Sequence, residues 1–226
     1  MHRDELVETN FFNYRDVDDL YYGLACEIQE VITESVNRAG TCNISLGREG
    51  VSESLFFILM TDPEFRSIPW SNVVLWILDE KETGSSDIKT WPWVYDLLLK
   101  PSGIMKDQVH RINTDILNPL QFLENKLTHH FDTSKKSFYF DYVLLGEIEN
   151  NWVGPLNIEN IDSAKNALLS CKNGVNLYTL SWKLVLNAKH ISIIKIHDCQ
   201  DKHIDNFLLK IQGLSCDPNL RFHVKR

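Results

Sequence analysis

The sequence predicts an α/β fold in which helices cover both faces of a mainly parallel, doubly wound sheet. Residues 73–78, 140–145 and 191–196 are apolar at nearly consecutive positions, which is typical of strands buried on both faces. Segments with helical periodicity separate these runs, and the order strand, turn, helix repeats along the chain. No repeat or Pro/Gly-rich hinge divides the sequence, so we expect a single domain over residues 1–226.

Helical periodicity is clearest in residues 17–38. Apolar residues recur there at every fourth position and form the stripe of an amphipathic helix: Leu20, Leu24, Ile28 and Ile32. Gly40 follows the stripe and is a suitable residue for ending the helix. Further helices are predicted over residues 52–60, 93–100, 119–130, 161–169 and 203–211, and shorter strands over residues 42–46, 109–112 and 176–180.

The composition is that of an ordinary globular protein, with 43% hydrophobic and 24% charged residues among 226. The formal charge of −8 does not attract nucleic acid through the overall field, so no DNA partner is expected. The sequence has neither a signal peptide nor an apolar run of about 18 residues, so no membrane contact is expected. The five cysteines form no C-x-x-C pair, which favours reduced thiols in the cytoplasm and no metal site.

In parallel α/β folds, ligands bind in the loops that follow the carboxyl ends of the strands. Residues 47–50 (G-R-E-G) follow the strand that ends at Leu46. Residues 79–81 (D-E-K) follow the next long strand, and residues 146–156 follow the strand that ends at Leu145. These loops are therefore where the sequence predicts a functional site.

The order and spacing of several phrases in the sequence resemble the 6-phosphogluconolactonase family, relatives of glucosamine-6-phosphate isomerase. Residues 68–73 (I-P-W-S-N-V) resemble the family's I-x-W-S-x-V, and residues 109–112 read V-H-R-I as in the family. Residues 140–146 (F-D-Y-V-L-L-G) are similar to its F-D-L-V-L-L-G. The resemblance extends from about Phe11 to about Val224 and implies the fold of that family.

The resemblance also implies a chemistry. Members of the family hydrolyse a phosphorylated sugar lactone in the pentose phosphate pathway, without a metal or an organic cofactor. A histidine in the loop G-M-G-x-D-G-H takes a proton from the attacking water, a task that suits a pKa near neutrality. An S-G-G-S-T-P turn and the arginine of a D-E-R triplet hold the phosphate. No cofactor is therefore expected here either.

Set against these motifs, the sequence departs from the family at the residues that carry the chemistry. Trp152 stands at the position of the catalytic histidine, and an indole cannot accept a proton from water. The paired glycines of the phosphate turn match Arg48 and Glu49, and the carboxylate of Glu49 would face an incoming phosphate with like charge. We therefore hypothesise a catalytically degenerate, 6-phosphogluconolactonase-like protein with no catalytic residue.

The alternative hypothesis is a divergent but active 6-phosphogluconolactonase that hydrolyses a phosphorylated sugar lactone. Lys81 replaces the arginine of the triplet, which keeps its charge but loses the bidentate fork. A relocated base at His110 is less favoured than a core or solvated histidine, because a base must reach the substrate's water directly. Only under this alternative is a sugar phosphate expected, held by Gly47, Arg48, Asp79, Lys81, Gly146 and Lys202.

A retained fold with a filled pocket offers a rigid surface to a macromolecular partner, either a protein or a ribonucleoprotein such as the ribosome. Aromatic side chains often anchor interfaces, and residues 220–226 alternate cationic and apolar side chains. A simpler interpretation of this tail is a last strand with a solvated face. The candidate partner-binding residues are Trp91, Trp93, Trp152, Arg221, Lys225 and Arg226.

Overall fold

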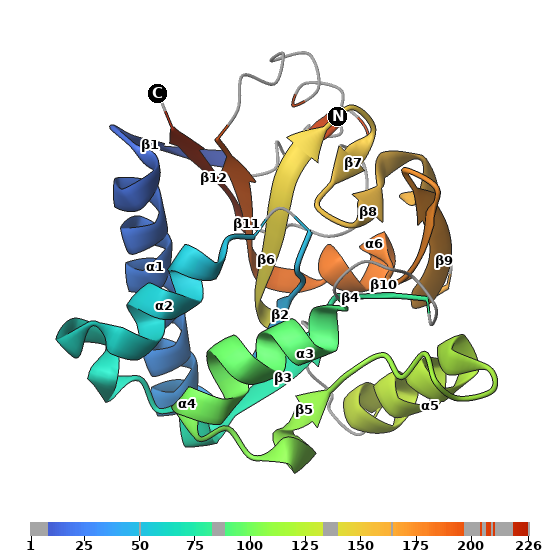
Figure 1. Cartoon of the computed structure of the whole chain (residues 1–226), viewed down its shortest axis with the longest axis horizontal. Helices are drawn as coiled ribbons and strands as arrows, with labels where there is room; N and C mark the ends of the chain where they lie inside the picture. The colour runs from blue at the N-terminus through green and yellow to red at the C-terminus, as the bar shows by residue number, and fades with distance from the viewer. Residues whose placement is uncertain are drawn as a thin grey trace, which may run out of the picture.

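The computed structural model describes residues 9–49, 51–82, 89–132, 140–163, 165–196, 204, 207, 208, 210 and 219–225. Its centre is a sheet with the strand order β1-β12-β11-β6-β2-β3-β5, in which every neighbouring pair is parallel (Figure 1). These strands are β1 (Thr9–Tyr14), β2 (Cys42–Leu46), β3 (Val73–Ile77), β5 (Val109–His110), β6 (Phe140–Glu149), β11 (Ala188–Lys195) and β12 (Asn219–Lys225). The predicted α/β fold with a mainly parallel sheet is confirmed.

Alternate side chains of the central strands enter two separate apolar cores, one on each face of the sheet. On β6, Tyr142 and Leu144 pack into one core, whereas Val143 and Leu145 pack into the other. Successive side chains of a strand point to opposite faces, so a strand with helices on both sides must be apolar at every position. This explains the consecutive apolar residues that predicted the sheet.

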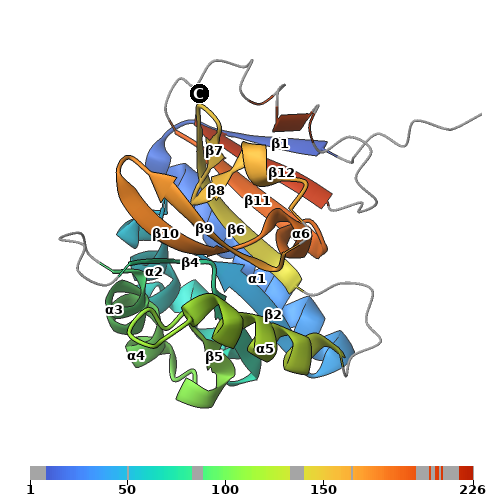
Figure 2. The same cartoon turned by 90° about the vertical axis from the view of Figure 1, so that its right-hand side faces the viewer.

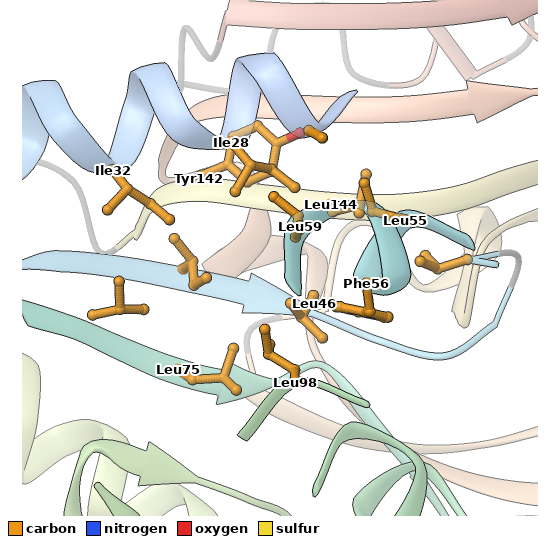
Figure 3. Packing of buried hydrophobic residues seen from close by; sticks show 14 of the residues in the cluster. Ile28, Ile32, Leu46, Leu55, Phe56, Leu59, Leu75, Leu98, Tyr142 and Leu144 are labelled. Atoms are coloured by element: carbon orange, nitrogen blue, oxygen red, sulfur yellow. The ribbon is translucent and has the colours of Figure 1, made fainter. Parts of the chain in front are cut away.

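Helices cover the first core on one face. They are α1 (Val17–Ala39), α2 (Glu53–Thr61), α3 (Thr90–Val94), a π-helical turn (Tyr95–Leu99) and α4 (Lys100–Ser102), with short 3-10 turns at Pro63–Ser67, Trp70–Asn72 and Lys106–Gln108. Figure 3 shows Leu46, Leu75 and Leu144 of the strands facing α1 and α2 in this core. No helix in the described part of the chain is both long and apolar enough to cross a lipid bilayer.

The first helix begins and ends close to the predicted residues. The side chain of Asp16 accepts a hydrogen bond from the backbone N–H of Asp19 (2.9 Å), which caps the helix at its start. Gly40 ends the helix with φ of 77°, a left-handed conformation that glycine adopts at little cost. Its N–H donates to the carbonyl of Val36 at 2.8 Å. Capping chemistry and periodicity therefore agree on this element.

A second sheet lies on the other face, beside α5 (Pro119–Asp132) and α6 (Trp182–Val185) (Figure 2). Its three strands are antiparallel, in the order β4-β10-β9: β4 (Asp79–Lys81), β10 (Val175–Leu180) and β9 (Ala167–Lys172). The helix predicted over residues 161–169 is therefore wrong. Asn173 and Gly174 both have positive φ, so they form a two-residue hairpin turn that pairs β9 with β10 along its whole length.

The segment expected as a loop after Leu145 is a hairpin instead. β6 continues to Glu149 and turns back at Asn150, whose φ is 52°, into β7 (Trp152–Val153) and β8 (Leu156–Asn157), followed by a 3-10 turn at Ile158–Asn160. Glu149 pairs with Trp152, and the hairpin hydrogen bonds replace the irregular loop that was expected. Trp152, which the sequence comparison predicts at the position of the family's histidine, therefore lies on a strand.

The C-terminal strand is also placed differently from the expectation. The predicted last strand is confirmed as β12. The prediction that one face of this strand is solvated is not confirmed. β12 lies between β1, which was not predicted, and β11, and Phe222 and His223 are 0% and 1% exposed. The predicted helix 203–211 has four described residues, 204, 207, 208 and 210, all of them helical. The single-domain organisation stays a prediction.

Candidate functional site

Four segments of the chain meet beyond the carboxyl ends of β2, β3 and β6. The turn after β2 supplies Arg48 and Glu49, β4 supplies Asp79 and Lys81, the β6–β7 hairpin supplies Trp152, and the end of β9 supplies Lys172. The segments touch closely, because a Cβ atom at Gly154 would lie 2.8 Å from the backbone nitrogen of Gly146 and 3.2 Å from the carbonyl oxygen of Glu49. The structure thus brings together the loops that the sequence singled out.

Asp79 is a fully buried carboxyl group at the base of this site. Its Oδ1 accepts the backbone N–H of Arg48 (3.0 Å), and its Oδ2 accepts the hydroxyl of Thr90 (3.0 Å). Burial, followed by the negative charge of Glu49, raises the pKa of Asp79 to about 7. A Cβ atom at Gly47 would lie only 2.0 Å from Asp79 Oδ1, so glycine at this position leaves room for the carboxyl group.

Glu80 has a structural task. Its carboxylate accepts the backbone N–H groups of Lys81 (3.0 Å), Thr90 (2.9 Å) and Trp91 (2.8 Å). It therefore holds the start of α3 against β4. Burial raises the pKa of Glu80, although these hydrogen bonds oppose the shift. Asp79 and Glu80 thus both accept backbone N–H groups and fix the backbone around the site.

Glu49 bridges two partly buried lysines. Its Oε1 lies 3.6 Å from Lys81 Nζ, and its Oε2 lies 3.4 Å from Lys172 Nζ. The side chains of Lys81 and Lys172 are 12% and 11% exposed, whereas that of Glu49 is 25% exposed. Lys172 Nζ also donates to the carbonyl of Gly154 (3.0 Å) and lies 5.6 Å from the ring centroid of Trp152. The cations that would meet an incoming anion already contact a carboxylate of the protein.

Lys172 was missed by sequence reasoning. It lies just beyond a segment that was predicted to be helical, where it would have no defined place beside Glu49. The signal that places it is the Asn173-Gly174 dipeptide, which is typical of a two-residue hairpin. That hairpin puts Lys172 at the end of β9, opposite Val175 and close to the turn after β2.

The aromatic candidates are distributed around the site. Trp152 is half-buried on β7 beside Lys172. Trp93 is buried, donates its indole N–H to Glu53 Oε1 (3.2 Å), and lies 5.8 Å below the guanidinium of Arg48. Trp91 is half-buried, with the Arg111 guanidinium 4.7 Å from its ring centroid. Trp91 is thus the tryptophan of α3 that reaches the surface.

The cationic candidates of the tail do not lie with the site. Arg221 is 17% exposed, lies 3.4 Å from Glu27 Oε2 and contacts His190 Nδ1 at 3.1 Å. Lys225 is exposed at the end of β12. Lys202 and Arg226 lie outside the described residues. In the described part of the chain, no group of three His, Cys, Asp or Glu side chains is placed to hold a metal ion.

The fold and the position of this site define a class: α/β proteins whose site lies at the carboxyl ends of parallel strands. More narrowly, the fold is that of 6-phosphogluconolactonases and of a glucosamine-6-phosphate deaminase, which confirms the resemblance drawn from the sequence at the level of the fold. No protein-family model and no curated protein sequence matches the chain.

The structural likeness covers nearly the whole chain. The 6-phosphogluconolactonase from Leishmania guyanensis is 14% identical, with a TM-score of 0.77 and 96% of each chain covered. The enzyme from Thermotoga maritima is also 14% identical, with a TM-score of 0.74, 97% of this chain and 100% of that chain covered. A monomeric glucosamine-6-phosphate deaminase is 13% identical, with a TM-score of 0.75 and 96% and 97% coverage.

Proposed function

We propose that the protein is a catalytically degenerate, 6-phosphogluconolactonase-like protein that acts as a binding module for a macromolecular partner. The observation that carries this proposal is the bridge from Glu49 to Lys81 and Lys172. A substrate phosphate would have to displace a carboxylate from both ammonium groups before it could bind. Such a displacement reduces affinity for the substrate in the ground state and in the transition state alike.

The missing base supports the same proposal. Trp152 matches the histidine of the family motif in the sequence resemblance, and its ring centroid lies 5.6 Å from Lys172 Nζ. His110 stacks on Trp76 at 4.0 Å, and burial lowers its pKa to about 4. His223 lies 3.0 Å from Glu27 in the opposite part of the molecule. These histidines therefore have structural partners of their own. Loss of a general base lowers the rate of the catalysed step by about 10²–10⁴-fold.

A lactonase assay on the purified protein tests the loss of catalysis. We expect 6-phosphogluconolactone to hydrolyse at its spontaneous rate in the presence of the protein, because the indole of Trp152, at the position that matches the family's histidine, cannot take a proton from water. An active lactonase of the same fold serves as the positive control. Turnover above the spontaneous rate that Lys81→Ala abolishes, in a variant that still unfolds cooperatively, would instead support the divergent, active 6-phosphogluconolactonase in the pentose phosphate pathway.

The partner is proposed to be a protein or a ribonucleoprotein, with the ribosome as the first to test. Among the sequence candidates, Lys225 is exposed and Trp91 and Trp152 are half-buried. The cytoplasm remains the predicted location. If Lys225 contacts RNA phosphate, cosedimentation with ribosomes should weaken as salt rises, and Lys225→Ala should reduce the slope of log affinity against log salt by about 1. Absence of cosedimentation at low salt would exclude the ribosome, and a protein partner would remain.

A further inference from the structure

We propose that Glu49 is a built-in occupant of an anion site formed by Lys81 and Lys172, and that an external phosphate group binds there once the Glu49 charge is removed. This inference deepens the proposed function, because the same contact accounts for the loss of substrate binding. Each oxygen of the carboxylate faces a different ammonium group, at 3.6 Å and 3.4 Å. Two oxygens of one phosphate can make the same pair of contacts.

Lys172 has side-chain contacts besides Glu49, and the backbone of Lys81 is fixed by a strand. Lys172 Nζ donates to the carbonyl of Gly154 at 3.0 Å and lies over the indole of Trp152. Lys81 lies on β4, whose backbone pairs with Leu177 of β10. Nearly nine-tenths of each lysine side chain is buried. A cation in this environment interacts more strongly with an anion than a solvated one does.

The neighbouring carboxyl groups do not replace Glu49. Asp79 accepts hydrogen bonds from the N–H of Arg48 and the hydroxyl of Thr90, and Glu80 accepts three backbone N–H groups. Glu49, in contrast, is the most exposed of the three carboxyl groups described here, on a turn at the surface. Its side chain is therefore the one that can leave the lysines without disturbing β4 or α3.

The test compares Glu49→Gln with wild type in titrations with inorganic phosphate and with 6-phosphogluconate, followed by calorimetry and by backbone amide chemical shifts. The variant is expected to bind phosphate at least about tenfold more tightly than wild type, because the competing intramolecular carboxylate is gone. The largest shift changes are expected at Lys81 and Lys172. Tighter binding of 6-phosphogluconate than of inorganic phosphate would identify a sugar phosphate as the source of the group.

Glu53→Gln is the matched control. It removes the same charge from the start of α2, where the carboxylate accepts the indole N–H of Trp93 (3.2 Å). An equal gain in phosphate affinity in the two variants would show that the change in net charge alone causes it, and would overturn the proposal. Equal affinity of wild type and Glu49→Gln, or no binding by Glu49→Gln, would also overturn it.

A second variant confirms the location. Adding Lys172→Met to Glu49→Gln should abolish the gained affinity, with folding verified by thermal unfolding. The lactonase assay separates this inference from the proposed function. Phosphate binding by Glu49→Gln without turnover supports both, whereas turnover by wild type refutes only the proposed loss of catalysis. A wild type that is inactive, together with a Glu49→Gln variant that binds no phosphate, refutes only the anion site.

Discussion

Replacing Glu27 with glutamine is expected to lower the free energy of unfolding by about 3–5 kcal/mol at pH 7, because it leaves the largely buried guanidinium of Arg221 without its counter-charge. Glu27 lies on α1 and is 7% exposed. Its Oε2 lies 3.0 Å from His223 Nε2 and 3.4 Å from Arg221 Nη1, both on β12, and Ser192 of β11 donates its hydroxyl to the same carboxylate. The network therefore fastens α1 to the sheet.

The pKa of Glu27 supports this role. Burial alone would raise it, but the hydrogen bond and charge of His223, with Ser192 and Arg221, lower the pKa from 4.5 to about 2. A depressed carboxyl pKa contributes stability above its unfolded value, and that contribution disappears as the pH falls through about 2. Denaturant unfolding at pH 7 measures the effect. The control is Glu30→Gln, on the exposed face of the same helix, which should change the free energy of unfolding by less than about 0.5 kcal/mol. An equal loss of stability in both variants would contradict the prediction.

Asp79 is expected to make the stability of the protein fall as the pH rises towards neutrality. Its pKa of about 7 in the folded protein lies above the ordinary value of 3.8, so the folded state binds the proton more tightly than the unfolded state. The stability from this group is complete below 3.8 and is lost as the pH rises to about 7. A shift of about three pKa units corresponds to about 4 kcal/mol.

The measurement is the difference in unfolding free energy between Asp79→Asn and wild type, at pH 5 and pH 8. Asparagine can still accept the N–H of Arg48 and can donate to Thr90, but it does not titrate. From pH 5 to pH 8, the unfolding free energy of the variant should rise by roughly 3 kcal/mol relative to that of wild type. Titrations that the two proteins share cancel in this comparison. In a Glu49→Gln background the change should shrink, because Glu49 contributes to the raised pKa. A difference independent of pH would show that Asp79 is ionised throughout.

Local patterns predicted the parts of the fold that depend on neighbours in the sequence. The apolar stripe and Gly40 gave the bounds of α1 within a residue, and the strand at residues 42–46 was correct. Consecutive apolar residues predicted burial on both faces, because that requirement acts on each strand by itself. The hairpin at Asn173-Gly174 was also a local signal, but the apolar residues of 161–169 were interpreted with helical rather than strand periodicity.

Contacts between distant segments could not be predicted in the same way. Arg221 was a candidate for partner binding because its tail is cationic, whereas the structure pairs it with Glu27 at the other end of the sequence. The turn after β2 was correctly placed at the site, but the pairing of Glu49 with Lys172 depends on how β9 is positioned against β2. Such pairs are set by the packing of the whole sheet, which no single segment encodes.

The place of β12 in the sheet has a consequence for how the protein is made. Within the described chain, β1 joins the sheet through β12, so β1 meets its neighbour only after residues 219–225 have been synthesised. Until then the nascent chain leaves one edge of β11 and the edge of β1 without a partner strand. Such unpaired edges favour aggregation, so completion of this fold during translation depends on protection of its N-terminal strand.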